Sequence, residues 1–391
     1  MNVAVIAPAQ IPARTANTLQ VMKMTQAIAE LGYGVRLAVP WYSTESASVA
    51  VRPATFPELA RHYGLQTEFP IDWLIANPNL RRYDFGYRAA GWASRWGAGV
   101  VYTRLPQAAA IASGRGQKTI LEVHDIPQGR FGPWFFRRFL RGSGAARLVV
   151  ITRSLAADLA SRLGAPADPP FTLIAPDGVD LSRYQDLPGP QAARASLEEF
   201  SQRGPRFTAG YTGHLYAGRG VELLLELAGL LPEVDFLLAG GEPGDVARLR
   251  GEIQSRGLEN VIATGFIPNV DLPRYQAACD ALLMPYQKHV AASSGGNIAR
   301  YLSPMKLFEY LACGRPILSS DLPVFAEVLN PGNSISLPCD DARAWAAALV
   351  ALQNDPPRRD ALGVQARQDA AHYTWEGRAR RILAGLEAPH G

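Results

Sequence analysis

NVAVIAPAQIPARTANTLQVMKMTQAIAELGYGVRLAVP, residues 2–40, is the stretch that decides the fold class. The apolar run Val3–Ala7 predicts a buried strand. Leu19–Leu31 has apolar residues at helical spacing and stops at Gly32, and Val35–Val39 reads as a second strand. A strand, a helix and a strand in this order indicate a parallel sheet with a right-handed crossover.

The same alternation continues through the chain. Further strands are predicted at 100–103, 119–123, 147–151, 171–174, 208–211, 235–239, 261–264, 281–284 and 316–319, with helices between them that include 304–312 and 322–328. Two consecutive strand–helix series predict an α/β protein with two doubly wound, Rossmann-like halves. Because open parallel sheets bind ligands beyond the carboxyl ends of their strands, we expect the halves to face each other across a cleft that holds the site. Prolines in 165–170 mark the expected boundary between domains 1–168 and 169–372.

Composition restricts the class of protein further. The chain has 391 residues, 48% of them hydrophobic, and a net charge of only +4. We therefore expect no nucleic-acid partner. Cys279, Cys313 and Cys339 form no CxxC pair, which favours a reducing compartment over a disulfide framework or a zinc site. The amino terminus lacks the pattern of a signal peptide and no run approaches the roughly 18 apolar residues of a membrane span, so we expect a cytoplasmic protein.

A helix that opens with a basic residue is the first candidate site. Ser303 is the expected N-cap and Pro304 the expected first helical residue. The free N–H groups and partial positive charge of a helix N-terminus suit a diphosphate, and Lys306 adds a full charge. Glu309 shares the face of Lys306 and could accept hydrogen bonds from two ribose hydroxyls. The alternative is a capped helix with a surface Lys–Glu pair, which the spacing alone favours.

Two strand-to-loop junctions are further candidates. Gly213–Gly220 follows a strand, and its glycines would let the backbone approach a phosphate that Arg219 grips. The alternative is an ordinary turn with a solvated arginine, since the spacing matches neither a P-loop nor GxGxxG. His124 and Asp125 follow the strand 119–123, where histidine can donate to a sugar hydroxyl or a developing charge. A plain hydrogen bond within the loop is the alternative there.

The segment Arg130–Arg141 interleaves four arginines with aromatic residues and contains no acid. Such a segment suits an anionic membrane interface. A helix that buries its aromatic residues and leaves its arginines in water explains the pattern equally well. Single-stranded nucleic acid is the least favoured partner.

Together these motifs resemble the retaining glycosyltransferase family 4, which has the GT-B fold. The resemblance is clearest from 148 to 316. Further matching pieces are Pro176–Asp180, which is similar to the family's PNGVD turn, Gly265–Pro268, which is similar to its nucleobase-holding segment, and Tyr373–Glu376, which is similar to the start of its final helix. The resemblance implies that 373–391 returns to the first domain.

The resemblance also implies roles by position. Arg219 and Lys306 would bind the diphosphate of a nucleotide-sugar and Glu309 its ribose, while His124 would lie beside the donor sugar. The remaining donor-binding positions are Asn17 in a closing loop, Gly213, His214, Gly265, Phe266, Ile267, Ser303 and Pro304. The family transfers a sugar with retention of configuration and generally needs no metal or other cofactor. The acceptor would be a glycan, a lipid-linked molecule or a small molecule.

One departure from the family pattern bears on function. The family often carries a glutamate eight residues before the one at Glu309, and Tyr301 stands there. A non-catalytic protein that binds nucleotide-sugar is therefore one alternative function, and a GT-B-type sugar-nucleotide epimerase is another. The donor sugar, its base and the acceptor are not specified by any motif.

Overall fold

The computed structural model describes residues 1–42, 53–80, 83–291 and 297–386. They form two compact units. Unit 1 holds Met1–Asp177 together with the segment from Trp375 onward, and unit 2 holds Gly178–Thr374. Each unit has its own sheet and is described separately.

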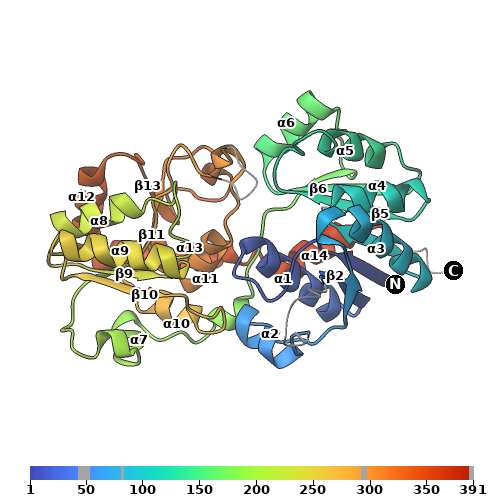
Figure 1. The fold of residues 1–391 in the computed structure, drawn as a ribbon. Helices are drawn as coiled ribbons and strands as arrows, with labels where there is room; N and C mark the ends of the chain where they lie inside the picture. Colours follow the sequence, from blue (N-terminus) through green and yellow to red (C-terminus); the bar gives the residue numbers. More distant parts are fainter. Residues whose placement is uncertain (43–52, 81–82, 292–296, 387–391) are drawn as a thin grey trace. The chain divides into compact units, whose positions relative to one another are not determined.

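Unit 1 is built on a parallel sheet whose strand order is β3-β2-β1-β4-β5-β6-β7 (Figure 1). Val3 in β1 lies opposite Val35 on one side and Val100 on the other. The strands are β1 (Asn2–Ile6), β2 (Gly34–Trp41), β3 (Ile71–Ile75), β4 (Val100–Thr103), β5 (Thr119–Val123), β6 (Ala145–Val150) and β7 (Thr172–Ile174). The helices are α1 (Ala16–Glu30), α2 (Phe56–Tyr63), α3 (Tyr83–Arg95), α4 (Pro106–Gly114), α5 (Gly132–Leu140), α6 (Arg153–Leu163) and α14 (Trp375–Leu383).

Helices cover both faces of this sheet. Successive strand residues point to opposite faces, so Ala4 and Ile6 of β1 pack with α3 and α4 in one apolar cluster. Helix α14 packs against α1, and the chain therefore returns to unit 1 after passing through unit 2 (Figure 1).

Unit 2 repeats the same topology. Its parallel strands run in the order β10-β9-β8-β11-β12-β13. They are β8 (Thr208–Thr212), β9 (Asp235–Ala239), β10 (Val261–Gly265), β11 (Ala281–Met284), β12 (Ile317–Ser320) and β13 (Ser334–Leu337). The helices are α7 (Pro190–Ala195), α8 (Val221–Leu230), α9 (Pro243–Ser255), α10 (Leu272–Ala277), α11 (Met305–Cys313), α12 (Ala342–Asn354) and α13 (Pro356–Ala370).

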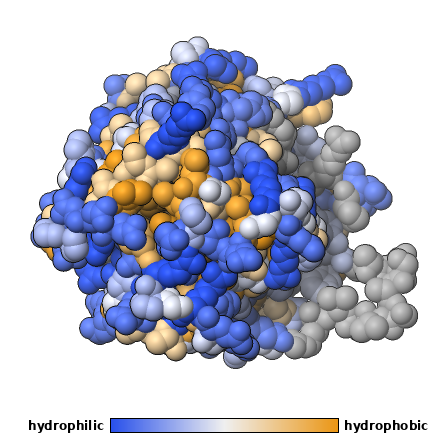
Figure 2. All heavy atoms as spheres, turned by 90° about the vertical axis from the view of Figure 1, so that its left-hand side faces the viewer, coloured by the Kyte–Doolittle hydropathy of each residue, from blue (hydrophilic) through white to orange (hydrophobic). Residues whose placement is uncertain are grey.

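Two apolar clusters fill the space on either side of this second sheet. Residues of α8, α9 and α12 form one of them, and residues of α10, α11 and α13 form the other. Figure 2 looks onto a face of the molecule where hydrophilic side chains surround an apolar area. Leu230 at the end of α8 and Val350 in α12 are among the exposed apolar side chains of unit 2.

The structure confirms the two doubly wound halves and corrects several elements. The strand at 172–174 pairs with β6 and so completes the first sheet instead of opening the second half. The division between the units falls at Asp177–Gly178, not within 165–170. The helix expected at 322–328 is only a 3-10 turn at Phe325–Glu327. The strands β3 and β13 and the helices α2, α3, α4, α7 and α13 were not predicted.

Candidate active site

The loops after β8, β9 and β10 lie together at the carboxyl edge of the second sheet. The Gly213 amide donates to the Ala239 carbonyl at 2.8 Å, and the Gly240 amide donates to the Gly265 carbonyl at 2.7 Å. Gly213, Gly240 and Gly265 have φ values of 133°, 124° and 80°, which favour glycine. The predicted phosphate loop and the predicted nucleobase segment are therefore neighbours.

Lys306 lies in the first turn of α11 and points its ammonium group toward this edge. Its Nζ is 3.7 Å from the centre of the Tyr211 ring and 5.5 Å from that of Tyr286. A Cβ at Gly213 would come within 2.7 Å of this Nζ. The Nζ is shielded from solvent and has no hydrogen-bond acceptor among the described residues. Burial and then the nearby charge of Arg219 hold the pKa of Lys306 well below its usual range.

Arg219 faces the same ring of Tyr286. Its guanidinium carbon is 5.0 Å from the ring centres of both Tyr216 and Tyr286. The Nε atom is buried without an acceptor among the described residues. Two basic side chains thus face one tyrosine, and an anion bound beside them would offset the repulsion between their charged forms. The alternative of a solvated arginine in an ordinary turn does not hold.

Glu309 completes this group from the inner side of α11. Its side chain is buried, and Gln276 donates to its Oε2 at 3.2 Å while also donating to Thr212 at 3.2 Å. The negative charge of Glu309 acts against the lowering of the Lys306 pKa. Burial of Glu309 excludes the surface Lys–Glu pair.

The start of α11 differs from the prediction by one residue. The helix begins at Met305, so Pro304 occupies the N-cap position and Ser303 precedes it. Pro304 itself cannot cap the helix, because proline has no side-chain acceptor. The first amides of an α-helix have no partner within the helix, and those of α11 belong to the same turn as Lys306.

The other predicted donor positions of unit 2 lie in the loops after β8 and β10 and before α11. The His214 ring stacks on Tyr216 with ring centres 5.0 Å apart, and the Tyr211 hydroxyl donates to the His214 carbonyl at 2.5 Å. Phe266 and Ile267 follow β10 and are half-buried. Tyr301, at the position of the family's other glutamate, is buried.

His124 belongs to unit 1, where it binds a buried carboxylate that sequence reasoning missed. Its Nε2 lies 2.5 Å from Oε1 of Glu122, the residue two positions earlier on β5. Residues two apart in a strand point to the same side, so the pairing follows from local geometry. Gln20 of α1 also binds Oε1, at 2.7 Å, and the Tyr102 hydroxyl donates to Oε2.

Arg378 supplies the counter-ion from α14. Its guanidinium lies 2.9 Å from Oε2 of Glu122, and both side chains are fully buried. It also donates to the carbonyls of Pro176 at 2.9 Å and Ala175 at 3.0 Å. Although burial alone would raise the pKa of Glu122, Arg378 and His124 hold that pKa well below its usual range. Burial and then Arg104 lower the pKa of His124 to about 4, so the imidazole is neutral at pH 7.

A third acid lies within this network. Burial raises the pKa of Asp177 to about 7. Ligand atoms of Glu122, His124 and Asp177 lie within 4.8 Å of one another, a spacing that a cation could use. Arg378 already compensates Glu122 with a direct contact, so we interpret the cluster as an ion-pair network.

Asn17 does not lie in a loop. Thr15 is the N-cap of α1, and Ala16, Asn17 and Thr18 form the first helical turn. The closing loop expected around Asn17 is thus the start of a helix, and Thr18 is held there by hydrogen bonds to the carbonyls of Ala13 and Thr15, both 2.8 Å. The structure brings Lys306 close to Gly213 and to the tyrosine that Arg219 also faces, whereas His124 and Asn17 belong to unit 1.

The segment Arg130–Arg141 divides its aromatic residues between core and surface. Phe136 and Phe139 of α5 are fully buried, whereas Phe131 is 48% and Trp134 55% exposed. Arg130, Arg137, Arg138 and Arg141 are all exposed. The aromatic residues of the segment are therefore divided between core and surface, and membrane contact stays a prediction.

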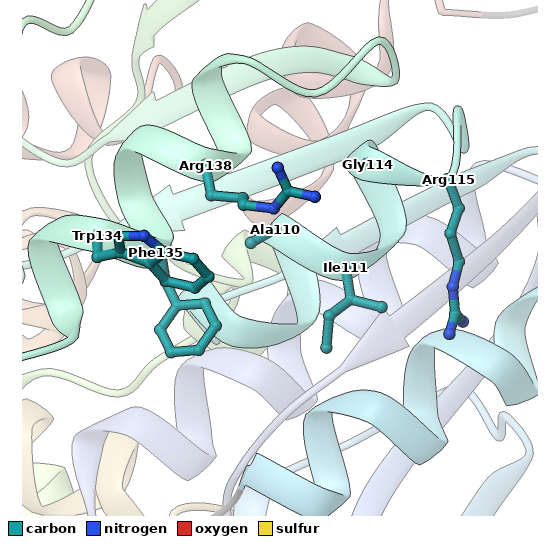
Figure 3. A pocket seen from close by; sticks show the side chains of 7 residues that line it. All are labelled: Ala110, Ile111, Gly114, Arg115, Trp134, Phe135 and Arg138. Carbon is teal, nitrogen blue, oxygen red and sulfur yellow. The ribbon is translucent and has the colours of Figure 1, made fainter.

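A pocket of about 210 Å³ opens between α4 and α5 (Figure 3). Trp134 and Phe135 lie at one end of it and Arg115 at the other, with Arg138 above Ala110. The guanidinium of Arg115 also lies 4.9 Å from the ring centre of Tyr87 on α3, which is itself exposed. Among the described residues, no helix has the length and apolar character to cross a membrane.

Comparisons with known proteins agree on one class. Residues 206–355 match the family model described as Glycosyl transferases group 1. The chain is 26% identical over 316 residues to the D-inositol 3-phosphate glycosyltransferase of Jonesia denitrificans. This alignment covers 76% of the present chain and 68% of that protein. It is 25% identical over 249 residues to the phosphatidyl-myo-inositol mannosyltransferase of Mycolicibacterium smegmatis, covering 62% and 58% of the two chains. The structure of Anabaena HepE with UDP and glucose aligns with a TM-score of 0.72 at 17% identity, over 98% of each chain.

Proposed function

Because this chain is a glycosyltransferase of the family 4 type, with two Rossmann-like domains of the GT-B class, we propose that it moves a hexose from a nucleoside-diphosphate sugar to a hydroxyl group with retention of configuration. The supporting observation is the pair of buried nitrogen atoms, Lys306 Nζ and Arg219 Nε, that have no acceptor among the described residues. Buried cations are stable only when paired, so the site is complete with an anion bound.

The chemistry of the donor explains how this pair acts. Negative charge grows on the diphosphate as the bond to the sugar breaks. Lys306, Arg219 and the first amides of α11 are already placed before the reaction, so stabilising that charge requires no reorganisation. Glu309 would accept hydrogen bonds from the ribose hydroxyls, and the segment Gly265–Ile267 would hold the base.

Retention of the sugar's configuration is compatible with a site in which no side chain deprotonates the acceptor hydroxyl. We propose front-face attack, in which the leaving phosphate takes the proton of the acceptor hydroxyl. The new glycosidic bond then forms on the face from which the diphosphate leaves. This route needs no metal or further cofactor, because the cations of the site replace them.

A donor screen tests this proposal. Release of nucleoside diphosphate is measured against UDP-, GDP- and ADP-sugars with a panel of acceptors, and Lys306→Gln and Arg219→Gln should each lower the rate at least about 100-fold. Lys288→Gln is the matched control, because the side chain of this exposed lysine of unit 2 pairs with Asp340. Turnover of the sugar without an acceptor would indicate an epimerase. Donor binding without turnover in any pairing would indicate a non-catalytic protein.

We propose further that unit 1 contacts an anionic membrane through α5 and its surroundings. The exposed side chains Phe131 and Trp134 can enter the interface while the four arginines of 130–141 meet phosphate groups. The relative that acts on phosphatidyl-myo-inositol supports a lipid-linked acceptor. The pocket between α4 and α5 adds Arg115 to the same surface.

Vesicle co-sedimentation tests this second proposal. The wild-type chain should bind vesicles that contain roughly 30% anionic phospholipid, and it should dissociate from them as the salt concentration rises. It should not bind vesicles made only of zwitterionic phospholipid. The double variant Arg137→Glu/Arg138→Glu should lose binding. Arg248→Glu, an exposed site of unit 2, is the control for charge. Binding that is insensitive to salt, or equal in the double variant, would contradict the proposal.

A further inference from the structure

A buried carboxylate in unit 1 has all of its acceptor positions in use. Oε1 of Glu122 binds Gln20 and His124, and Oε2 binds Tyr102 and Arg378. Arginine, the glutamine amide and the tyrosine hydroxyl act as donors here, and an ionised carboxylate only accepts. The proton shared with His124 is therefore on Nε2 of the imidazole.

The groups around the imidazole fix its state further. Glu122 on β5 faces Nε2, and the guanidinium groups of Arg104 and Arg378 disfavour a second proton on the ring. Tyr102 and Asp177 are the other titratable groups of the cluster. A neutral ring with a proton on Nε2 has a lone pair on Nδ1, and the His124 side chain remains 19% exposed.

We propose that Glu122 and Arg378 are positioning residues that hold His124 in one tautomer and one orientation, so that Nδ1 accepts a hydrogen bond from a sugar hydroxyl. This inference rests on the proposed transfer reaction for the identity of the sugar. The histidine is then an acceptor, where its sequence context had suggested a donor. Arg378 acts from α14 through Glu122, because its own contacts are the carboxylate and the carbonyls of Pro176 and Ala175.

The chain offers a matched control for this role. Arg147 on β6 also fastens α14, with hydrogen bonds to the carbonyls of Arg381 at 3.3 Å and Ala384 at 3.0 Å. Its hydrogen bonds within the described residues go to backbone carbonyls and not to Glu122 or His124. A variant of Arg147 therefore loosens the same helix without changing the charge beside the imidazole.

Nitrogen NMR of the histidine side chains in the donor-free protein tests the positioning directly. In the wild type, His124 should carry its proton on Nε2 and show no titration between pH 5 and 8. In Arg378→Gln the imidazole should titrate within that range, and Arg378→Lys should restore the wild-type behaviour. Arg147→Gln should leave the His124 signals unchanged. An Nδ1 proton in the wild type, or an unchanged titration in Arg378→Gln, would overturn the proposal.

The rate of transfer supplies a second readout. Arg378→Gln should lower kcat about tenfold at pH 6 and much less at pH 8, because protonation of the His124 imidazole at low pH removes the Nδ1 acceptor. The kcat of the wild type should change little between these two pH values. The Glu122→Gln/Arg378→Gln variant removes both charges together and keeps the test available if the single variant does not fold. Its kcat should depend on pH, whereas the kcat of the wild type should not. Failure of the transfer reaction itself would leave the NMR result intact, so the two proposals are distinguishable.

Discussion

Lys306 shows how a single residue can favour function over stability. Its ammonium group is shielded from water and contacts tyrosine rings, with no acceptor among the described residues. Because the pKa of Lys306 is lowered in the folded chain, the unfolded chain binds more protons at neutral pH, and this difference opposes folding. Such a site is retained when a ligand supplies the missing charge.

Replacing this lysine by an apolar side chain should separate the two effects. We expect Lys306→Met to keep or raise the free energy of unfolding without ligand, by up to about 1 kcal/mol, because the desolvation cost disappears. The rise in Tm that UDP or another nucleoside diphosphate causes in the wild type should vanish. Thermal unfolding with and without nucleotide measures both. A fall in Tm of several degrees without nucleotide would show that the ammonium group stabilises the fold.

Asp177 should make stability depend on pH in the opposite sense to a surface acid. Its pKa is raised to about 7 in the folded chain, so between its unfolded value and pH 7 the folded state binds the extra proton. Its contribution to stability is therefore present at low pH and declines as pH rises through about 7. Asp177→Asn resembles the protonated acid, so it should be more stable than the wild type by a clearly larger margin at pH 8 than at pH 5. Denaturant titrations at both values check this, and an equal effect at both would contradict it.

At the scale of elements, the approach of the β8 loop to α11 depends on the absence of a side chain. A Cβ at Gly213 would meet Lys306 Nζ at 2.7 Å, and the φ of 133° disfavours other residues. Gly213→Ala should therefore displace Lys306 and weaken nucleotide binding at least tenfold, measured by calorimetric titration. Gly251→Ala in α9 meets nothing within 4 Å and should instead stabilise the chain by about 0.5–1 kcal/mol without changing nucleotide affinity.

The sequence predicts those elements whose residues are mostly apolar on both faces. β4, β5 and β9 are fully buried, and their apolar residues predicted their bounds even though β5 contains Glu122 and β9 begins at Asp235. β3 and β13 are sheet edges of mixed burial, and their short patterns resemble loops. The helix α13 carries charged residues around most of its surface, which obscured its period. The turn at Phe325–Glu327 has apolar residues at helical spacing but packs them within a single short turn.

The candidate site was predictable only where a motif is local. Lys306 and Glu309 share one helix, and Arg219 shares one loop with Gly213, so short spacing was enough to find them. The pairing of Glu122 with Arg378 joins residues from opposite ends of the chain, which no local pattern reveals. One signal was available: an acid inside a fully buried strand must have a partner.

At the scale of the whole molecule, α14 should be essential to the unit at the other end of the sequence. Removing residues 375–391 would leave Glu122 buried without its counter-ion, a change that costs about 3–5 kcal/mol in addition to the lost packing on α1. Hydrogen exchange of the truncated chain should show faster exchange throughout β1, β4 and β5. The amides of unit 2 should exchange as fast as in the full-length chain, and bound nucleotide should still slow the exchange of residues 213–220. Unchanged exchange in unit 1 would contradict this prediction.

The return of α14 to unit 1 also determines the order in which the two units can complete their folds during translation. At about 5–20 residues per second, translation of 178–374 takes about 10–40 s, and throughout that interval the nascent amino-terminal half contains an acidic core strand still awaiting its arginine. The half that leaves the ribosome first is thus the last to mature, whereas the half made later contains all its strands and helices as soon as it emerges. For this topology, the unit that is synthesised first is the one that completes its fold last.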